Sequence, residues 1–242
     1  MKTINAYNMH FQTLNDEVRG CSDNEIVIEN CLGQRYIASG LGGKRITIHG
    51  VPGNALGAYL DGCEIIVEGN AQDATGDTMN GGSIVIHGMA GDATGYAMRG
   101  GKIFIKGNVG YRAGIHMKEY KEKVPVIVVG GVAGSFLGEY QAGGIIVVLG
   151  IGAEGKPPVG YFCGTGMHGG KIYLRCSKMP EGLPPQVSVE EAGKDDMDLI
   201  EGYIKEFCDK FNISIDEILS EKFYVLKPNT KNPYRQLYTQ NL

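Results

Sequence analysis

Asp73 and Asp92 are the residue pair whose type and spacing come closest to catalytic chemistry. They occupy equivalent corner positions in two glycine-rich segments, 19 residues apart. If those segments stack as neighbouring strands do, the carboxylates lie about 5 Å apart, near the separation used by retaining glycosidases. This spacing raises the hypothesis of a carbohydrate lyase or hydrolase. The competing interpretation is structural, because an aspartate beside a turn glycine commonly bonds local backbone and the nearest base in this column is the displaced Arg112.

Residues 150–155 satisfy the pattern GxGxxG, and Lys156 extends it toward a P-loop. Both motifs place phosphate at the N-terminus of a helix, and an NAD site also needs an acid about 20 residues further on. Here Pro157 stands where a P-loop has Ser or Thr, and no Asp or Glu occurs between Glu154 and Glu181. The following stretch is glycine-rich and has no helical period. We therefore interpret the motif as a glycine-rich corner.

The histidines and cysteines are weaker candidates. His49 and His87 share a column but lie two repeats apart, about 9.6 Å by strand spacing, which is too far to share one zinc ion. Cys163 and His168 form a conceivable nucleophile pair, but nothing in the sequence orients the histidine. The six cysteines contain no CxxC pair and are interpreted as reduced thiols. Residues 116–123 form a charged insertion that is either solvated or a partner contact.

The element that must position all these residues is a short strand, repeated eight times. Each copy has four residues rich in β-branched side chains. The copies span residues 26–30, 46–50, 65–69, 84–88, 103–107, 126–130, 146–150 and 172–176. Their spacing of 19–20 residues over most of this range leaves no room for a helix and fits a multiple of six poorly. We therefore predict an all-β solenoid over residues 20–178, a right-handed single-stranded parallel β-helix of about eight coils with a small C-terminal α-helical extension.

Stacking would turn equivalent strand positions into two ladders. The inward ladder is predicted to contain Ile103, Val126 and Ile146 with their counterparts, which makes a dry aliphatic core. The alternate positions would face water, yet they too are mostly apolar: Val27, Thr47, Ile66, Val85, Phe104, Ile127, Val147 and Tyr173. An apolar stripe of that length implies a cover, either the chain's own C-terminal segment or another subunit.

A second glycine pattern marks the corners between strands. Glycine supplies positive φ or close backbone approach at such corners. The predicted structural turn glycines are Gly53, Gly57, Gly76, Gly91, Gly95, Gly110, Gly114, Gly134 and Gly138. We expect no catalytic, cofactor-binding or metal-binding residue in the chain.

The repeat is flanked by segments of different composition. Residues 1–19 form an N-terminal segment, and residues 179–242 form a proline-marked linker followed by C-terminal helices and a tail. Apolar positions at helical spacing predict a helix over 195–211, and residues 214–217 resemble a capping box for a second short helix. Residues 223–228 are predicted as a last strand and the end of the chain as a surface tail. We expect these helices to pack on the repeat.

Composition argues against several classes of protein. The 242 residues include 38 glycines, well above the usual ~7%. The net charge of −4 argues against a dedicated nucleic-acid binder. The N-terminus has no apolar core of signal-peptide length, and glycines interrupt the longest apolar stretch, so we expect a cytoplasmic protein without a membrane span.

Residues 81–95 read GGSIVIHGMAGDATG and carry the repeated motif GG-x-I-x-I-x-G-x-x-G-x-x-x-G. This motif resembles the GXGXG domain at the C-terminus of the glutamate synthase large subunit. The two predicted helices and the last strand are similar to the end of that domain, so the resemblance covers residues 20–242. A related domain occurs in one of the subunits of formylmethanofuran dehydrogenase, which is the nearest alternative.

The resemblance implies a limited role for this chain. In glutamate synthase an N-terminal amidotransferase hydrolyses glutamine, an FMN and iron–sulfur barrel reduces the iminoglutarate, and the GXGXG domain holds these parts in register. This chain has no N-terminal cysteine nucleophile, because Lys2 follows Met1 and Cys21 is the earliest cysteine. It therefore looks like a stand-alone structural subunit that works with separate amidotransferase and FMN-binding subunits, which would hold the FMN and the iron–sulfur cluster. A homo-oligomer also remains open.

Overall fold

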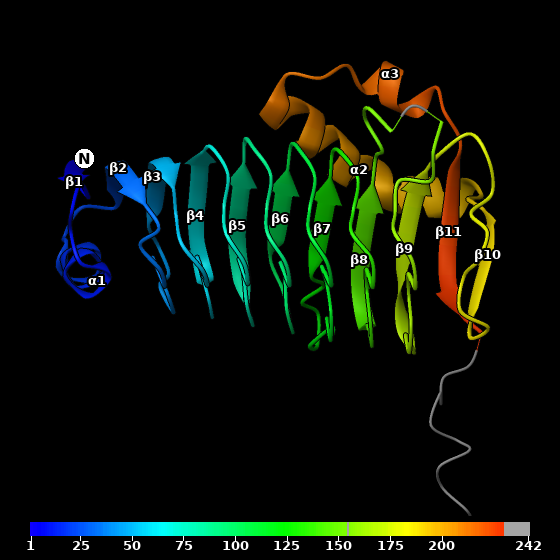
Figure 1. The fold of residues 1–242 in the computed structure, drawn as a ribbon, viewed down its shortest axis with the longest axis horizontal. Helices are drawn as coiled ribbons and strands as arrows, with labels where there is room; N and C mark the ends of the chain where they lie inside the picture. The colour runs from blue at the N-terminus through cyan, green and yellow to red at the C-terminus, as the bar shows by residue number, and fades with distance from the viewer. Residues whose placement is uncertain (154, 230–242) are drawn as a thin grey trace, which may run out of the picture.

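The computed structural model describes residues 1–153 and 155–229, which form one sheet with three helices beside it (Figure 1). The strands lie side by side along the long axis of the molecule. They are β1 (Lys2–Asn5), β2 (Glu25–Leu32), β3 (Arg45–Val51), β4 (Asp61–Glu68), β5 (Gly81–Ile86), β6 (Lys102–Ile105), β7 (Val126–Val129), β8 (Ala142–Val148), β9 (Gly169–Arg175), β10 (Val187–Glu191) and β11 (Phe223–Pro228). The helices are α1 (Phe11–Gly20), α2 (Lys194–Phe211) and α3 (Ile215–Leu219).

The fold class expected from the repeat is wrong. Instead of a right-handed β-helix of about eight coils, the described residues form one 11-stranded sheet in the order β1-β2-β3-β4-β5-β6-β7-β8-β9-β11-β10. Neighbouring strands from β1 to β9 are parallel, whereas β11 is antiparallel to both β9 and β10. The sheet is therefore mixed, and its C-terminal edge is made by strands from outside the repeat.

The backbone conformation of the segments between the strands explains why the repeat does not form the predicted β-helix. Ala55, Gly57 and Tyr59 have φ values of 60°, 63° and 57°, and the equivalent residues of later repeats are also left-handed. Left-handed residues at alternate positions prevent an extended conformation, so these segments remain turns. Successive turns still bond to one another, for example from the Ala55 amide to the Asp73 carbonyl at 2.9 Å. The turns therefore stack without adding strands to the sheet.

The inner face of the sheet forms the main core. Its isoleucines lie in register across eight strands, and each is at most 1% exposed: Ile26, Ile46, Ile65, Ile84, Ile103, Ile127, Ile146 and Ile172. Leu14 and Val18 of α1 belong to the same cluster of buried side chains. Helix α1 thus closes the N-terminal end of this core.

The register expected for β7 is wrong by one residue. Ile127 pairs with Ile103 and Ile146, whereas Val126 points to the opposite face of the sheet. A shift of one residue exchanges the two faces of a strand, because side chains alternate. The glycines that follow successive strands bond to one another and explain the shift. The Gly150 amide donates to the Gly131 carbonyl rather than to that of Gly130.

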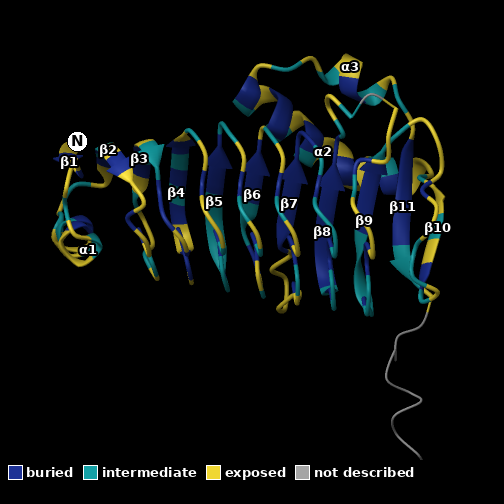
Figure 2. Cartoon of the chain, viewed as in Figure 1, coloured by how far each residue is buried: buried dark blue, intermediate teal, exposed yellow. Residues whose placement is uncertain are grey.

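Helix α2 covers the outer face of β5 to β9 and supplies the cover that the apolar stripe requires. Phe104, Val128 and Tyr173 pack there against apolar side chains of the helix. Figure 2 shows buried residues in each of these strands, with intermediate residues toward the N-terminal ends of β5 and β9, whereas α1 and β10 have many exposed residues. Of the two covers expected from the sequence, the chain's own C-terminal segment is therefore found over β5 to β9, whereas Val27 and Thr47 on β2 and β3 lie outside this cluster and are half-buried.

The predicted C-terminal helices and last strand are confirmed. Helix α2 spans Lys194–Phe211, and β11 spans Phe223–Pro228. The Ser214 hydroxyl accepts a hydrogen bond from the Glu217 amide at 3.4 Å and caps α3. Strand β1, helix α1 and strand β10 were not predicted. The expected surface tail, residues 230–242, and Glu154 of the GxGxxG motif lie outside the described residues.

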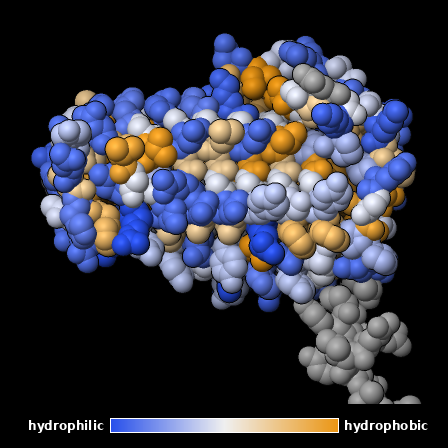
Figure 3. All heavy atoms as spheres, in the orientation of Figure 1, coloured by the Kyte–Doolittle hydropathy of each residue, from blue (hydrophilic) through white to orange (hydrophobic). Residues whose placement is uncertain are grey.

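Figure 3 shows bands of similar hydropathy that run along the long axis of the molecule. Such bands arise because equivalent residues of successive repeats lie side by side. Within the described residues, no helix combines the length and the apolar character needed to cross a bilayer.

Candidate functional site

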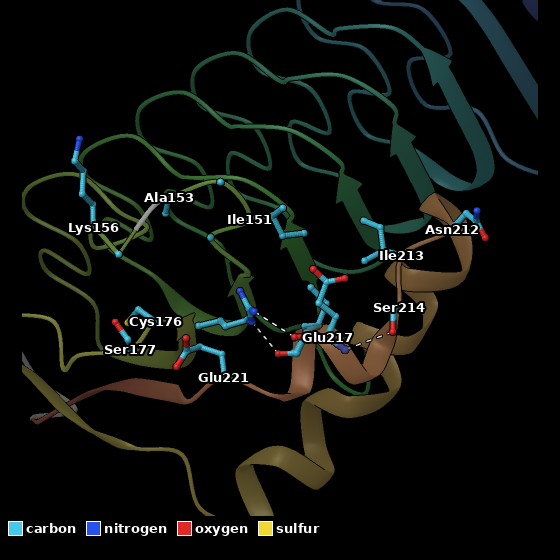
Figure 4. Close-up of a pocket in the computed structure, with 15 residues that line it drawn as sticks. Ile151, Ala153, Lys156, Cys176, Ser177, Asn212, Ile213, Ser214, Glu217 and Glu221 are labelled. Atoms are coloured by element: carbon cyan, nitrogen blue, oxygen red, sulfur yellow. Dashed lines mark hydrogen bonds between the residues drawn. The ribbon is translucent and has the colours of Figure 1, made fainter.

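A groove of about 550 Å³ opens between the loop after β8 and the connection from α2 to α3 (Figure 4). Lys156 enters its lining from the loop, and Glu217 enters from α3. The groove is lined by residues 150–153, 155–156, 175–177, 212–214, 217–218 and 221. It therefore contains most of the GxGxxG motif and is the natural place to test that motif.

Four described backbone amides in and beside the motif are already engaged and are not available to a phosphate. The amides of Gly150 and Ile151 donate to carbonyls of the preceding repeat at 3.1 and 2.8 Å, and those of Ala153 and Lys156 donate to carbonyls within the loop at 3.0 Å each. The next element after β8 is β9, so the motif does not lead into a helix as a P-loop or dinucleotide-binding motif does. Anion binding needs converging N–H groups. The geometry agrees with the interpretation of this motif as a corner.

Arg175 at the base of the groove is also engaged. Its guanidinium donates to the carbonyls of Ile218, Leu149 and Glu217 at 2.8, 3.1 and 3.3 Å. Burial and the charge of a nearby glutamate raise the pKa of the Cys176 thiol in the groove to about 11. The arginine thus joins α3 to β8 and β9, and the thiol is neutral at physiological pH.

Asp73 and Asp92 lie on adjacent turns, as the repeat predicts, and each carboxylate bonds backbone. Asp73 Oδ1 accepts from the Asp92 amide at 2.9 Å, and Asp92 Oδ1 accepts from the Tyr111 amide at 2.8 Å. The carboxylates thus link one turn to the next. This is the bonding expected from the structural interpretation, extended across the repeat.

The turn glycines face two different constraints. Gly95 has φ +71°, and a β-carbon there would approach Ile127 Cδ1 to 2.5 Å. Gly91 has no such φ, but a β-carbon there would lie 2.9 Å from the Asp73 amide nitrogen of the preceding turn. Gly57, Gly76, Gly114 and Gly138 resemble Gly95, and Gly53, Gly110 and Gly134 resemble Gly91. The first group meets the core, and the second group meets the neighbouring backbone.

The histidine and cysteine candidates are not brought together into a site. Cys163 is 1% exposed, and burial raises its pKa to about 12, so no thiolate is available beside His168. His49 and His87 lie beside Glu29 and Glu68, with 3.9 Å between nitrogen and oxygen in each pair. Within residues 1–153 and 155–229, no group of three His, Cys, Asp or Glu side chains is arranged to hold a metal ion.

Asp196 is the centre of a polar cluster that the sequence does not reveal. It is 8% exposed, and its Oδ1 accepts from Lys171 Nζ at 2.7 Å and from the Tyr173 hydroxyl at 2.9 Å. Its Oδ2 accepts from Lys227 Nζ at 3.3 Å. Burial alone would raise the Asp196 pKa, but the two hydrogen bonds and the lysine charges outweigh it and lower that pKa. One carboxylate therefore ties α2 to β9 and β11.

Aromatic side chains gather on the turns toward the C-terminal end of the repeat, and we call this surface the aromatic turn edge. Its members are Tyr96, Tyr111, His116, Phe136, Tyr140, Tyr161 and Phe162. His116 stacks on Tyr140 with 5.2 Å between ring centroids, and Phe136 stacks on Phe162 at 5.0 Å. Tyr161 is 80% exposed, and Phe162 is 55% exposed. The sequence prediction missed this edge because its members come from four repeats.

Stacked strands joined by glycine-rich corners, with helix α2 over one face of the sheet, define a class of protein that is built from repeats. The chain belongs to the GXGXG motif family, whose pattern it matches over residues 24–230. This confirms the resemblance inferred from residues 81–95.

Two individual proteins can be compared with this chain. It is 46% identical to an uncharacterized protein of Methanocaldococcus jannaschii, and the alignment covers 99% of this chain and 97% of that protein. A chain in the crystal structure of the formyltransferase/hydrolase complex (FhcABCD) from Methylorubrum extorquens, in complex with methylofuran, has a TM-score of 0.63. That match has 20% identity and covers 91% of this chain and 88% of the other, so the two chains share a fold.

Proposed function

We propose that this chain is a non-catalytic structural subunit of a cytoplasmic, glutamate-synthase-like complex. In this role it holds a separate amidotransferase and a separate FMN and iron–sulfur subunit in register. The observation that carries the proposal is the aromatic turn edge, where Tyr111, Tyr161 and Phe162 are each more than half exposed. Exposed tyrosine and phenylalanine are enriched in the buried centres of protein interfaces.

The groups best suited to chemistry are already used to hold the structure. The Asp73 and Asp92 carboxylates bond neighbouring turns, Arg175 bonds three carbonyls, and Asp196 anchors α2. A chain whose polar groups are engaged in this way is suited to be a rigid support, and its partner subunits would carry out the reaction.

The donor groups of this chain do not fit an iron–sulfur cluster, which needs about four converging thiolates. Cys31, Cys63 and Cys163 are buried, and burial raises the pKa of each thiol. We therefore assign the FMN and the cluster of the proposed complex to partner subunits, and we derive no step through them.

A second candidate function is a role like that of the related subunit in formylmethanofuran dehydrogenase. The structural similarity to a chain of the formyltransferase/hydrolase complex favours it. Both candidates make this chain a scaffold, and they differ in the partners that it holds.

Co-expression tests the proposal. The chain is produced with separately encoded amidotransferase and FMN-binding subunits, and the complex is isolated through a tag on this chain. We expect all three proteins in one complex that forms glutamate from glutamine and 2-oxoglutarate, and no turnover by this chain alone. Failure of both subunits to associate would overturn the proposal. The same co-expression with formylmethanofuran dehydrogenase subunits in their place tests the second candidate, which association in that experiment would support.

A further inference from the structure

A cleft of about 580 Å³ lies at the end of the aromatic turn edge, between the last turn of the repeat and the linker to β10. Its lining includes Tyr161 and Phe162 from the turn and Pro180 and Leu183 from the linker. This volume falls within the ~300–1,000 Å³ of small binding pockets, so it accommodates a few side chains rather than a folded domain. An extended segment is the shape that fits.

The lining of the cleft is apolar except for one charged side chain. Among its lining residues Glu181 is the one ionised side chain, because the Cys163 thiol has a pKa of about 12. The remaining lining consists of proline, valine, leucine, glycine and aromatic residues. Lys156 lines the adjoining hollow beyond Pro157 and does not line this cleft. An occupant with an apolar anchor and one basic group complements both features.

The cleft continues the stacked wall of the aromatic turn edge. Phe162 stacks on Phe136 at 5.0 Å, and the Arg112 guanidinium lies 4.7 Å from the centre of the Phe136 ring. Arg112 is paired with Glu139 at 3.1 Å, so this wall adds no unbalanced charge. A segment leaving the cleft would therefore run along an aromatic surface, with Glu181 as its charged contact.

We propose that this cleft is the docking site for an extended segment of a partner subunit, in which an apolar side chain adjoins a lysine or arginine. The apolar side chain fills the space between Phe162 and Leu183, and the basic group pairs with Glu181. This inference rests on the proposed function, and it names the place and the chemistry of the contact between the two proteins.

The repeat itself supplies variants that should fold. Phe162 has φ 61°, and Ala55, Ala74 and Ala93 stand at the equivalent position of earlier turns with φ of 60°, 56° and 53°. Phe162→Ala therefore introduces a residue that this backbone position already accepts. Tyr161→Ser likewise follows Ser135, its equivalent in the preceding turn.

Matched controls come from the same fold. Tyr59 is 56% exposed on an early turn, and Thr78 is its equivalent in the next one, so Tyr59→Thr removes an exposed ring away from the cleft. Glu201 is an exposed acid on α2, so Glu201→Lys matches the charge change of Glu181→Lys at a distant site.

The test measures binding of each purified variant to the recombinant amidotransferase and FMN-binding subunits by biolayer interferometry, at about 0.05 and 0.5 M salt. We expect Phe162→Ala, Tyr161→Ser and Glu181→Lys each to weaken binding to one of these partners about tenfold or more. Of these variants, only Glu181→Lys should reduce the dependence of binding affinity on salt concentration. The two controls should change binding less than about twofold.

Hydrogen exchange supplies a readout that needs no substitution. Partner binding should slow exchange in residues 157–163 and 180–183 and leave the early turn at 54–60 unchanged. If the wild-type chain binds a partner but the cleft variants bind equally well and the cleft is not protected, the docking site is wrong and the proposed function stands. If the wild-type chain binds neither partner, both are wrong.

Discussion

The carboxylate of Asp92 accepts a hydrogen bond from the backbone amide of Tyr111, 2.8 Å away and 19 residues later in the chain. Asp73 makes the same bond to the amide of Asp92 at 2.9 Å. Asn70 and Asn108 make comparable bonds to Met89 and Val132. A side-chain oxygen that reaches one repeat ahead is thus a recurring link between turns, and the charge of aspartate is not required for it.

Replacement of Asp92 tests whether its side chain stabilises the fold as a hydrogen-bond acceptor. Asp92→Asn keeps an acceptor oxygen and should change the free energy of unfolding by less than ~0.5 kcal/mol. Asp92→Ala leaves the Tyr111 amide without its partner and should cost about 1 kcal/mol. Urea denaturation of both variants measures the difference. Equal losses in the two variants would show that the bond to Tyr111 is not what Asp92 contributes.

Gly95→Ala should destabilise the chain by about 2–4 kcal/mol. The new β-carbon would adopt a left-handed conformation and would also meet Ile127 Cδ1 at 2.5 Å. Gly33 provides the control, because its φ is +79° but nothing lies within 4 Å of a β-carbon there. Gly33→Ala should cost about 1 kcal/mol. Thermal unfolding measures both, and similar shifts would mean that contact with the core is unimportant at Gly95.

Asp196→Asn should cost about 2–3 kcal/mol near pH 7, because two lysines and the Tyr173 hydroxyl lose a buried carboxylate. The folded-state pKa of Asp196 is lowered. Its contribution is therefore fully present above the unfolded value of about 4 and is lost as the pH falls through the folded pKa.

The difference in unfolding free energy between wild type and Asp196→Asn should accordingly shrink below about pH 4. Urea titrations at several pH values test this. Asp195→Asn is the matched control, since Asp195 is exposed in the same helical turn and should cost at most ~1 kcal/mol through the helix dipole. A pH-independent difference for Asp196→Asn would contradict the assignment.

Gln141→Met should stabilise the chain by about 1 kcal/mol. Gln141 is fully buried, and its Oε1 has no hydrogen-bond partner within the described residues. Met117 and Met167 occupy the equivalent inward positions of the neighbouring turns, each three residues after a turn glycine. Calorimetry measures the change. A loss of stability would mean that the two Gln141 Nε2 bonds to Gly143 and Gly144 outweigh the unpartnered oxygen.

Local periodicity was sufficient to predict the strands of the repeat, since four-residue β-branched copies separated by glycine corners leave few other structures. It also predicted α2, α3 and β11 from apolar spacing and a capping pattern. It was insufficient at β7, where the charged insertion at 116–123 breaks the spacing. Either Gly130 or Gly131 could then close the strand, and only the bond between Gly131 and Gly150 decides between them.

The polar and aromatic clusters of the structure were less predictable than the strand pattern. Asp73 and Asp92 were singled out by their equivalent positions, which also place them where each can bond the next turn. Asp196 gave no such signal, because it lies on helix α2 and its partners lie 23 to 31 residues away on strands β9 and β11. The aromatic turn edge was hidden for the same reason.

By itself the sequence determined the period of the strands, the glycine corners and the apolar stripe that needs a cover. These depend on alternation and spacing within a few residues, which the chain carries locally. Only the tertiary structure decided that the turns remain outside one mixed 11-stranded sheet, that α2 provides the cover, and that Asp196 anchors it. Those outcomes depend on contacts between segments that are distant in the sequence. Such contacts stabilise the structure only after the chain has packed.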